Sequence, residues 1–248
     1  MDRKYSGGII DLDPRIIAVN ERVREIKNVI AIVSGKGGVG KSIISTIIAL
    51  QLARRGYKVG LLDTDFTSPS THIILNAKNI NPIENKGIIP PEIHGIKYMT
   101  ITYYTQNNPT PLRGVDISNT LIEILTITRW GSLDYLIIDA PPGISDITLD
   151  LLRIRWNIKF IIVATPSKLA IETIRKLINL LMEQKAEILG IIINMIMENM
   201  KINDIENLGL KILCKIPFQY DMEERINNVE ELLRTEIGRR LCEATSII

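Results

Sequence analysis

Short apolar runs rich in Ile and Val alternate along this chain with longer segments of helical period, and this alternation is the strongest constraint on its fold. Several runs are apolar almost throughout, as strands covered on both faces of a sheet must be. The pattern predicts βαβ units and therefore an α/β fold, a doubly wound, mostly parallel sheet with helices on both faces. The predicted strands are 28–34, 58–64, 95–101, 134–140, 159–165, 187–194 and 211–216, and the predicted helices between them are 42–56, 118–130 and 168–184.

The 248 residues are expected to form a single domain, 1–248, because one domain of this fold class commonly reaches this size. Residues 1–27 are interpreted as an N-terminal helical extension, since Asp13 is a good N-cap and Pro14 suits the first helical position. The stretch 76–111, rich in Asn, Pro and Thr, is predicted to be irregular. Active sites in such sheets lie where parallel strands end, so residues that follow strands are the candidates for chemistry.

The first such place is the stretch SGKGGVGKS at 34–42, directly after a predicted strand and at the start of a predicted helix. Its spacing, Gly-x-x-x-x-Gly-Lys-Ser, is the P-loop pattern, whose glycines let backbone N–H groups surround a phosphate. Lys41 is predicted to reach the β- and γ-phosphates, and the Ser42 hydroxyl to bind Mg²⁺. A flexible glycine turn is the alternative, and the position between strand and helix argues against it. The predicted nucleotide contacts of this loop are Gly35, Lys36, Gly37, Gly38, Val39, Gly40, Lys41, Ser42 and Ile43.

Aspartates follow two other predicted strands, where a P-loop protein needs ligands for its Mg²⁺. Asp139 lies in LIIDAPPG, and an aspartate after an apolar run is the Walker B arrangement, with a surface turn as the alternative. Asp63 and Asp65 end LLDTD; one is expected to face water or metal near the γ-phosphate, while the other caps the next segment. We favour Asp65 as the residue that orients the attacking water. All three aspartates are candidate metal ligands beside Ser42, and the Gly143 N–H is expected to reach the γ-phosphate.

The overall composition argues against several classes of function. A formal net charge of +2 and the absence of a long Lys or Arg run give no reason to expect nucleic-acid binding. The first ten residues lack the apolar core of a signal peptide, and no apolar run approaches the roughly 18 residues of a transmembrane helix. The two cysteines, Cys214 and Cys242, form neither a CxxC pair nor a disulfide framework. We therefore expect a soluble cytoplasmic protein with no membrane partner.

Together these residues resemble the deviant Walker A group of ATPases, which contains MinD, ParA, ArsA and the nitrogenase iron protein. The likeness rests on GKGGVGKS, which has an additional lysine, Lys36, at its second position. Within the group the chain looks most like the Mrp-type iron–sulfur cluster carriers, the ApbC/Nbp-like ATPases. Matching stretches run along most of the chain: GYKVGLLDTDFTSPS, GIKYMTI, PLRG, SLDYLIIDAPPGISD, VATPSKLAIETIRK, LGIIINM and IPF.

The resemblance implies a slow, dimer-dependent ATPase that uses ATP and Mg²⁺. In this group the lysine corresponding to Lys36 reaches the nucleotide of the partner subunit, where a cation stabilises charge on the transferred phosphoryl group. Lys36, Lys41 and Asp65 are then the catalytic residues of a homodimer with nucleotide at its interface. The adenine contacts of the group correspond to Asn194 and, less directly, to Pro217. For Asn194 an ordinary strand-end turn asparagine is the alternative.

One departure from the family pattern concerns the iron–sulfur cluster. Mrp-type carriers have a CxxC pair downstream of the asparagine that corresponds to Asn194, and each subunit contributes it to a bridging cluster. Here that region reads IMENMKINDIENLGLKI and contains no cysteine. Cys214 and Cys242 are interpreted as small buried hydrophobes, so their spacing does not predict a bound cluster. The predicted function is an ATPase switch that serves iron–sulfur cluster assembly or transfer to apo-protein clients without the usual cluster ligands.

The C-terminal segment leaves a second function open, because MinD relatives use a C-terminal amphipathic helix to bind membranes. Acidic residues are as frequent as basic ones around its apolar stripe, which favours packing on the core or on a dimer partner. A MinD- or ParA-like positioning ATPase at a membrane or on DNA is therefore the alternative function, and a nucleotide-dependent module with negligible turnover is a third. The stripe comprises Val229, Leu232, Leu233, Ile237 and Leu241.

Overall fold

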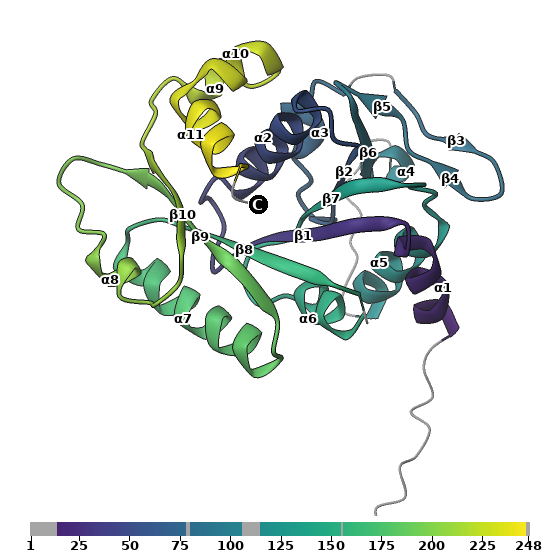
Figure 1. Ribbon diagram of the computed structural model, residues 1–248, viewed down its shortest axis with the longest axis horizontal. Coiled ribbons are helices and arrows are strands. Elements are labelled where there is room, and N and C mark those ends of the chain that lie inside the picture. The colour runs from purple at the N-terminus through teal and green to yellow at the C-terminus, as the bar shows by residue number, and fades with distance from the viewer. Residues whose placement is uncertain (1–13, 78–79, 106–114, 155, 247–248) are drawn as a thin grey trace, which may run out of the picture.

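The computed structural model describes residues 14–77, 80–105, 115–154 and 156–246 (Figure 1). Its central sheet contains β1 (Ile26–Ser34), β2 (Val59–Asp63), β5 (Glu92–Ile93), β6 (Ile96–Thr100), β7 (Leu133–Asp139), β8 (Ile158–Ala164), β9 (Glu187–Ile196) and β10 (Ile212–Pro217). The strand order is β10-β9-β8-β1-β7-β2-β6-β5, and all neighbours are parallel except β5 and β6. The predicted mostly parallel α/β sheet is confirmed, with a strand at each of the seven predicted places.

Helices cover both faces of the sheet, as Figure 1 shows. One face carries α2 (Lys41–Arg54), α3 (Thr71–Ile74), α9 (Met222–Arg225), α10 (Val229–Arg234) and α11 (Glu236–Ala244), and the other carries α1 (Pro14–Val23), α5 (Val115–Ile127), α6 (Asp146–Arg153) and α7 (Lys168–Glu183). The short α4 (Thr102–Thr105) and α8 (Asn203–Glu206) lie in connections. Each face has its own hydrophobic cluster, because successive strand residues point to opposite sides: Ile30 and Ile32 of β1 join one cluster, and Ala31 and Val33 join the other.

The first described helix is shorter than the predicted N-terminal extension. Its proposed N-cap, Asp13, lies outside the described residues, and α1 ends at Val23, so that β1 already begins at Ile26. Val19 and Val23 are buried in the same cluster as the strands, and α1 packs against α5. Within the described residues, α1 is therefore part of the core layer.

The stretch 76–111 is less irregular than predicted in its described part. It holds β3 (Ile83–Glu84) and β4 (Ile88–Ile89), which pair with each other, in addition to β5 and β6. The buried side chains of Ile88 and Ile93 explain why these short strands are held in place.

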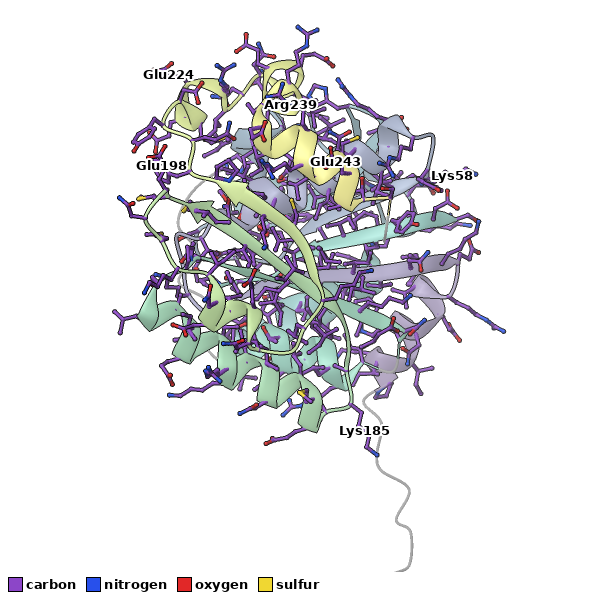
Figure 2. All side chains as sticks on the ribbon, turned by 60° about the vertical axis from the view of Figure 1, so that its left-hand side comes forward. Lys58, Lys185, Glu198, Glu224, Arg239 and Glu243 are labelled. Carbon is purple, nitrogen blue, oxygen red and sulfur yellow. The ribbon has the colours of Figure 1, made fainter. Side chains whose placement is uncertain are left out.

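The C-terminal apolar stripe is buried against the core. It lies on α10 and α11, two helices separated by Thr235, and α11 packs on α2 and β10. Figure 2 shows Arg239 and Glu243 on the outer surface of α11, where charged side chains meet water. Among the described residues, no helix is both long enough and apolar enough to cross a membrane. Of the two expected positions for this segment, on the core or on a dimer partner, the structure shows packing on the core.

Candidate active site

The loop between β1 and α2 carries the predicted phosphate contacts at the carboxyl edge of the sheet, beside the ends of β7 and β8. Gly40 has a left-handed backbone (φ 79°) and supplies no side-chain hydrogen bond to α2. The first N–H groups of α2 are therefore left for an anion, which the positive end of the helix also attracts. Gly35 is needed for close packing, since a Cβ there would lie 2.7 Å from Thr173 Oγ1 and 2.9 Å from the backbone nitrogen of Ile174.

Lys41 forms a buried ion pair with Asp139 at the base of this loop. Its Nζ lies 2.6 Å from Oδ1 of Asp139 and 3.5 Å from the Ser42 hydroxyl, and its side chain is only 6% exposed. Asp139 is fully buried, and its second oxygen, Oδ2, has no hydrogen-bond partner among the described residues. Because a buried carboxylate oxygen without a partner is costly, this atom marks a place where a cation or a donor is expected.

Asp63 stands beside Asp139, because β2 and β7 pair in a register that sets these two residues opposite each other. Burial, and secondly the charge of Asp139, raise the pKa of Asp63 to about 7. The Asp63 carboxylate accepts hydrogen bonds from the Thr71 hydroxyl (2.6 Å) and from the backbone N–H groups of Asp65 (3.1 Å), Ser70 (3.3 Å) and Thr71 (3.2 Å). Of the two aspartates, Asp63 is therefore the one that fixes the position of residues 65–71, which include the start of α3.

Asp65 lines a cavity of about 360 Å³ that lies over the P-loop. Its side chain is half-buried, and Oδ1 accepts hydrogen bonds from the Thr67 hydroxyl (2.9 Å) and the Ser68 N–H (3.1 Å). P-loop residues 36–43 form the floor of the same cavity, and its apolar wall contains Ile73, Ile74 and Ile226. The structure thus places Asp65 next to the predicted phosphate contacts; its role in orienting water stays a prediction.

Two other predicted contacts are engaged within the chain in this structure. The Nζ of Lys36 donates to Oγ of Ser167, the N-cap of α7, over 3.3 Å. The N–H of Gly143 donates to the carbonyl of Ser34 at 2.8 Å, so it does not point freely toward a phosphate. Lys36 belongs to the P-loop and Gly143 contacts its first residue, and each predicted role requires exchange of one hydrogen bond.

The two residues assigned to adenine come together in a second cavity. Asn194, in the last residues of β9, donates from Nδ2 to the carbonyl of Val39 over 2.8 Å and is buried. Pro217, at the end of β10, lines the cavity together with Asn194, Gly40 and Ile43. This cavity abuts the P-loop, and residues absent from the sequence prediction, Phe218, Gln219 and Met222, complete its wall.

The two cysteines lie in a strand and a helix, as predicted. Cys214 is buried in β10, and burial raises the pKa of its thiol to about 11, which disfavours the thiolate that a metal requires. Cys242, in α11, is half-buried. Over the described part of the chain, no three His, Cys, Asp or Glu side chains gather into a metal site.

Sequence patterns missed the residues that orient the aspartates. Ser70 and Thr71 donate to Asp63, and the Thr71 hydroxyl also contacts the buried Tyr98 hydroxyl at 2.8 Å. The signal available for them was the SPST stretch before a short apolar segment, which is typical of a helix start. Tyr98 carried no signal, because it lies within an apolar strand pattern.

Curated proteins with related sequences include several that are named iron-sulfur cluster carrier proteins. The chain is 33% identical over 231 residues to the iron-sulfur cluster carrier protein of Aquifex aeolicus, which covers 86% of this chain and 64% of the relative. It is 34% identical over 226 residues to the carrier protein of Pseudomonas fragi, with 82% and 77% covered. The chain thus spans less than two thirds of the Aquifex relative's own length.

Solved structures with the same fold include nucleotide-bound proteins. A nucleotide-binding protein of Archaeoglobus fulgidus in complex with ADP has 28% identity and a TM-score of 0.72, with 92% of both chains covered. The septum site-determining protein MinD of Pyrococcus horikoshii, complexed with Mg-ADP, has a TM-score of 0.66 at 19% identity over 88% of this chain and 94% of MinD, a likeness of fold alone.

Residues 25–247, nearly the whole chain, match the ParA family described as NUBPL iron-transfer P-loop NTPase. This match includes the P-loop, the aspartates at the ends of β2 and β7, and the cavity that contains Asn194. The chain belongs to the NUBPL iron-transfer P-loop NTPase family of ParA-type proteins, as the sequence resemblance indicated.

Proposed function

We propose that this protein is a Mg²⁺-dependent ATPase that acts as a homodimeric switch in iron–sulfur cluster assembly or transfer in the cytoplasm. The observation that carries the proposal is the buried Lys41–Asp139 pair beneath a P-loop whose helix N-terminus has no side-chain cap. Lys41 lies in the phosphate-binding loop, with its Nζ 2.6 Å from Asp139 Oδ1. It can therefore exchange this carboxylate for phosphate oxygens without leaving the site.

The donor set fits Mg²⁺. Asp139 offers a buried oxygen, Oδ2, that has no partner among the described residues. Lys41 Nζ contacts the other oxygen of this carboxylate and lies 3.5 Å from the Ser42 hydroxyl. Hard oxygen ligands of this kind suit Mg²⁺, which also keeps water and phosphate oxygens around it. When bound, the ion supplies positive charge that offsets the charge of the phosphate groups. We assign Asp139 and Ser42 to its coordination shell, whereas Asp63 positions the loop that contains Asp65.

Hydrolysis then depends on two groups that face the cavity. Asp65 is half-buried and keeps one hydrogen-bonded oxygen toward Thr67 and Ser68, which holds its carboxylate at the cavity wall to orient a water molecule. Lys36 also lines the cavity, and its ammonium donates one hydrogen bond of 3.3 Å to the neutral Ser167 hydroxyl, which a nucleotide phosphate of a partner subunit can replace. Dimer formation would thus complete the site, and nucleotide state would control the dimer.

The role in iron–sulfur assembly rests on the family and on the named carrier relatives. The Cys214 thiol is buried, and residues 196–212 contain no cysteine pair, so the chain does not have the usual cluster ligands of the carriers it resembles. We therefore propose that this chain supplies the nucleotide-driven step to apo-protein clients and leaves cluster ligation to other residues or proteins.

The decisive test measures phosphate release and ATP-dependent dimerisation for the native protein and for Lys41→Ala and Asp65→Asn. Loss of turnover in both variants, with dimerisation on ATP retained in Asp65→Asn, supports an ATPase switch. Native protein that binds ATP without releasing phosphate would instead be a nucleotide-dependent interaction module. Anaerobic reconstitution with iron and sulfide, comparing native protein with a Cys214→Ala, Cys242→Ala variant, tests the assignment of the cysteines: a stable cluster lost in the variant would overturn it.

A further inference from the structure

A third cavity, lined mainly by polar and charged side chains, lies at the opposite edge of the sheet from the P-loop. Its volume is about 360 Å³, and it is bordered by the amino ends of β1, β6 and β7 and by the ends of α1 and α5. Three cationic side chains line it: Arg22 from α1, Lys97 from β6 and Arg129 after α5. None of the residues in this cavity belongs to the site described above.

Each of the three cations is held by a backbone carbonyl rather than by a carboxylate. Arg22 Nε donates to Thr126 O over 3.0 Å, Lys97 Nζ to Trp130 O over 2.5 Å, and Arg129 Nη1 to Asn85 O over 2.7 Å. Within the described residues, no Asp or Glu lies within ion-pair distance of any of them. The hydrogen bonds fix the side chains, while the remaining N–H donors and all three positive charges stay available.

The largely buried Trp130 also lines the cavity, and its carbonyl is the acceptor for Lys97. The residue is 1% exposed, and its Nε1 has no hydrogen-bond partner among the described residues. The indole therefore lies close to the cavity but is covered by protein, and its role here is that of a reporter. Three cations without a carboxylate partner among the described residues call for a ligand rich in acceptor oxygens.

We propose that this cavity binds a small phosphate ester. Two guanidinium groups match the geometry of phosphate oxygens, and the Lys97 ammonium adds a point charge beside them. The cavity is larger than one phosphate group requires, and Glu21 and Glu25 also line it. Their carboxylates accept hydrogen bonds, which suits hydroxyl groups on the organic part of the ester and disfavours a bare polyanion.

Trp130 makes the site directly observable, because the chain has only two tryptophans. The other, Trp156, donates its Nε1 to Leu151 O over 2.9 Å and does not line this cavity. A Trp156→Phe variant therefore leaves the indole of Trp130 as the sole tryptophan. We expect ribose 5-phosphate, titrated at constant ionic strength, to change its emission saturably. Arg22→Gln and Arg129→Gln should each weaken binding about tenfold, as expected for loss of a hydrogen bond to a charged group.

Two control variants test whether the change in emission arises from binding in this cavity. Lys215→Gln removes an exposed lysine paired with Glu206 elsewhere and should leave the titration unchanged. Gly40→Ala in the P-loop should also leave it unchanged, since the two cavities share no residue. Arg22 is on the surface of α1, so its variant keeps the test valid if Arg129→Gln fails to fold.

The proposal fails if Trp130 emission shows no saturable change below about 1 mM ligand. It also fails if Arg22→Gln and Arg129→Gln titrate like Lys215→Gln, because the two cations would then only hold the backbone carbonyls of Thr126 and Asn85. Equal affinity for inorganic phosphate and ribose 5-phosphate would overturn the assignment of an ester.

Discussion

Replacing Lys41 with methionine should destabilise the nucleotide-free protein strongly, although lysine and methionine have similar apolar stems. The substitution leaves Asp139 fully buried without its 2.6 Å partner, with the equally buried Asp63 beside it. Removing one member of a buried pair costs about 3–5 kcal/mol of unfolding free energy, because an uncompensated charge remains. The double variant Lys41→Met, Asp139→Asn removes both charges and should recover about 2 kcal/mol or more of that loss.

The chain offers a matched control on its surface. Lys27 Nζ lies 2.8 Å from Asp134 Oδ1, a separation close to that of the buried pair, but the lysine side chain is 75% exposed. Water screens such a pair, so Lys27→Met should cost clearly less stability than Lys41→Met. The comparison isolates burial as the cause, since chemistry and geometry are nearly the same.

The effect of Lys41→Met should also depend on pH. Burial raises the folded-state pKa of Asp63 from 3.8 to about 7, and the positive charge of Lys41 opposes that rise. A folded-state pKa above the unfolded one means that folding takes up a proton, so stability is lost as pH rises through the folded pKa. Without Lys41 the folded pKa of Asp63 rises further, and the loss of stability should be larger at about pH 8 than at about pH 5.5.

Urea denaturation of the nucleotide-free proteins, followed by circular dichroism at both pH values, measures these differences. The reasoning about the buried pair is refuted if Lys41→Met loses no more stability than Lys27→Met. It is equally refuted if the double variant is no more stable than Lys41→Met alone, since removal of the second charge would then bring no recovery.

Three further substitutions test the site itself. Asp65→Asn keeps an oxygen for the loop hydrogen bonds but loses the carboxylate, so phosphate release should fall about a hundredfold with ADP affinity unchanged; normal turnover would rule out the assigned role. Lys36→Ala should keep ATP affinity within about threefold in equilibrium binding, yet lower ATP-dependent dimerisation in light scattering and reduce turnover at least about a hundredfold. If it hydrolyses ATP normally, Lys36 does not act across an interface. Gly40→Ala combines a positive φ of 79° with a Cβ 2.5 Å from Asn194 Nδ2, and should weaken nucleotide binding at least about tenfold. Gly38→Ala is the control, because Gly38 has a similar φ of 73° but open space where the Cβ would lie. This variant should lose clearly less nucleotide affinity than Gly40→Ala.

Several features of the fold and site follow from local sequence alone. Strands that bury both faces must be apolar throughout, so the runs before Ser34, Asp63 and Asp139 were recognisable without a structure. Parallel strands place their carboxyl ends at one edge, which predicted that the P-loop and the aspartates would meet there. The spacing of glycine and lysine in the P-loop involves only neighbouring residues, so it can be recognised from the sequence alone.

Tertiary structure alone decided how these residues pair. Lys41 meets Asp139 across 98 positions of sequence, and Asp63 lies opposite Asp139 only because β2 and β7 are neighbours in register. Which of Asp63 and Asp65 faces the cavity depends on Ser70 and Thr71, whose donors hold Asp63. Strand order and register are set by packing of whole layers, so no short stretch of sequence encodes them.

For the same reason, the cavity proposed to bind a phosphate ester could not be predicted from the sequence. Arg22, Lys97 and Arg129 stand in three separate segments with no shared motif, and each alone resembles an ordinary surface cation. Only the packing of α1 on α5, with β6 alongside, brings their charges together around Trp130. Local pattern therefore determined the strands and the phosphate loop, whereas long-range packing determined the ion pair, the cavities and their charge.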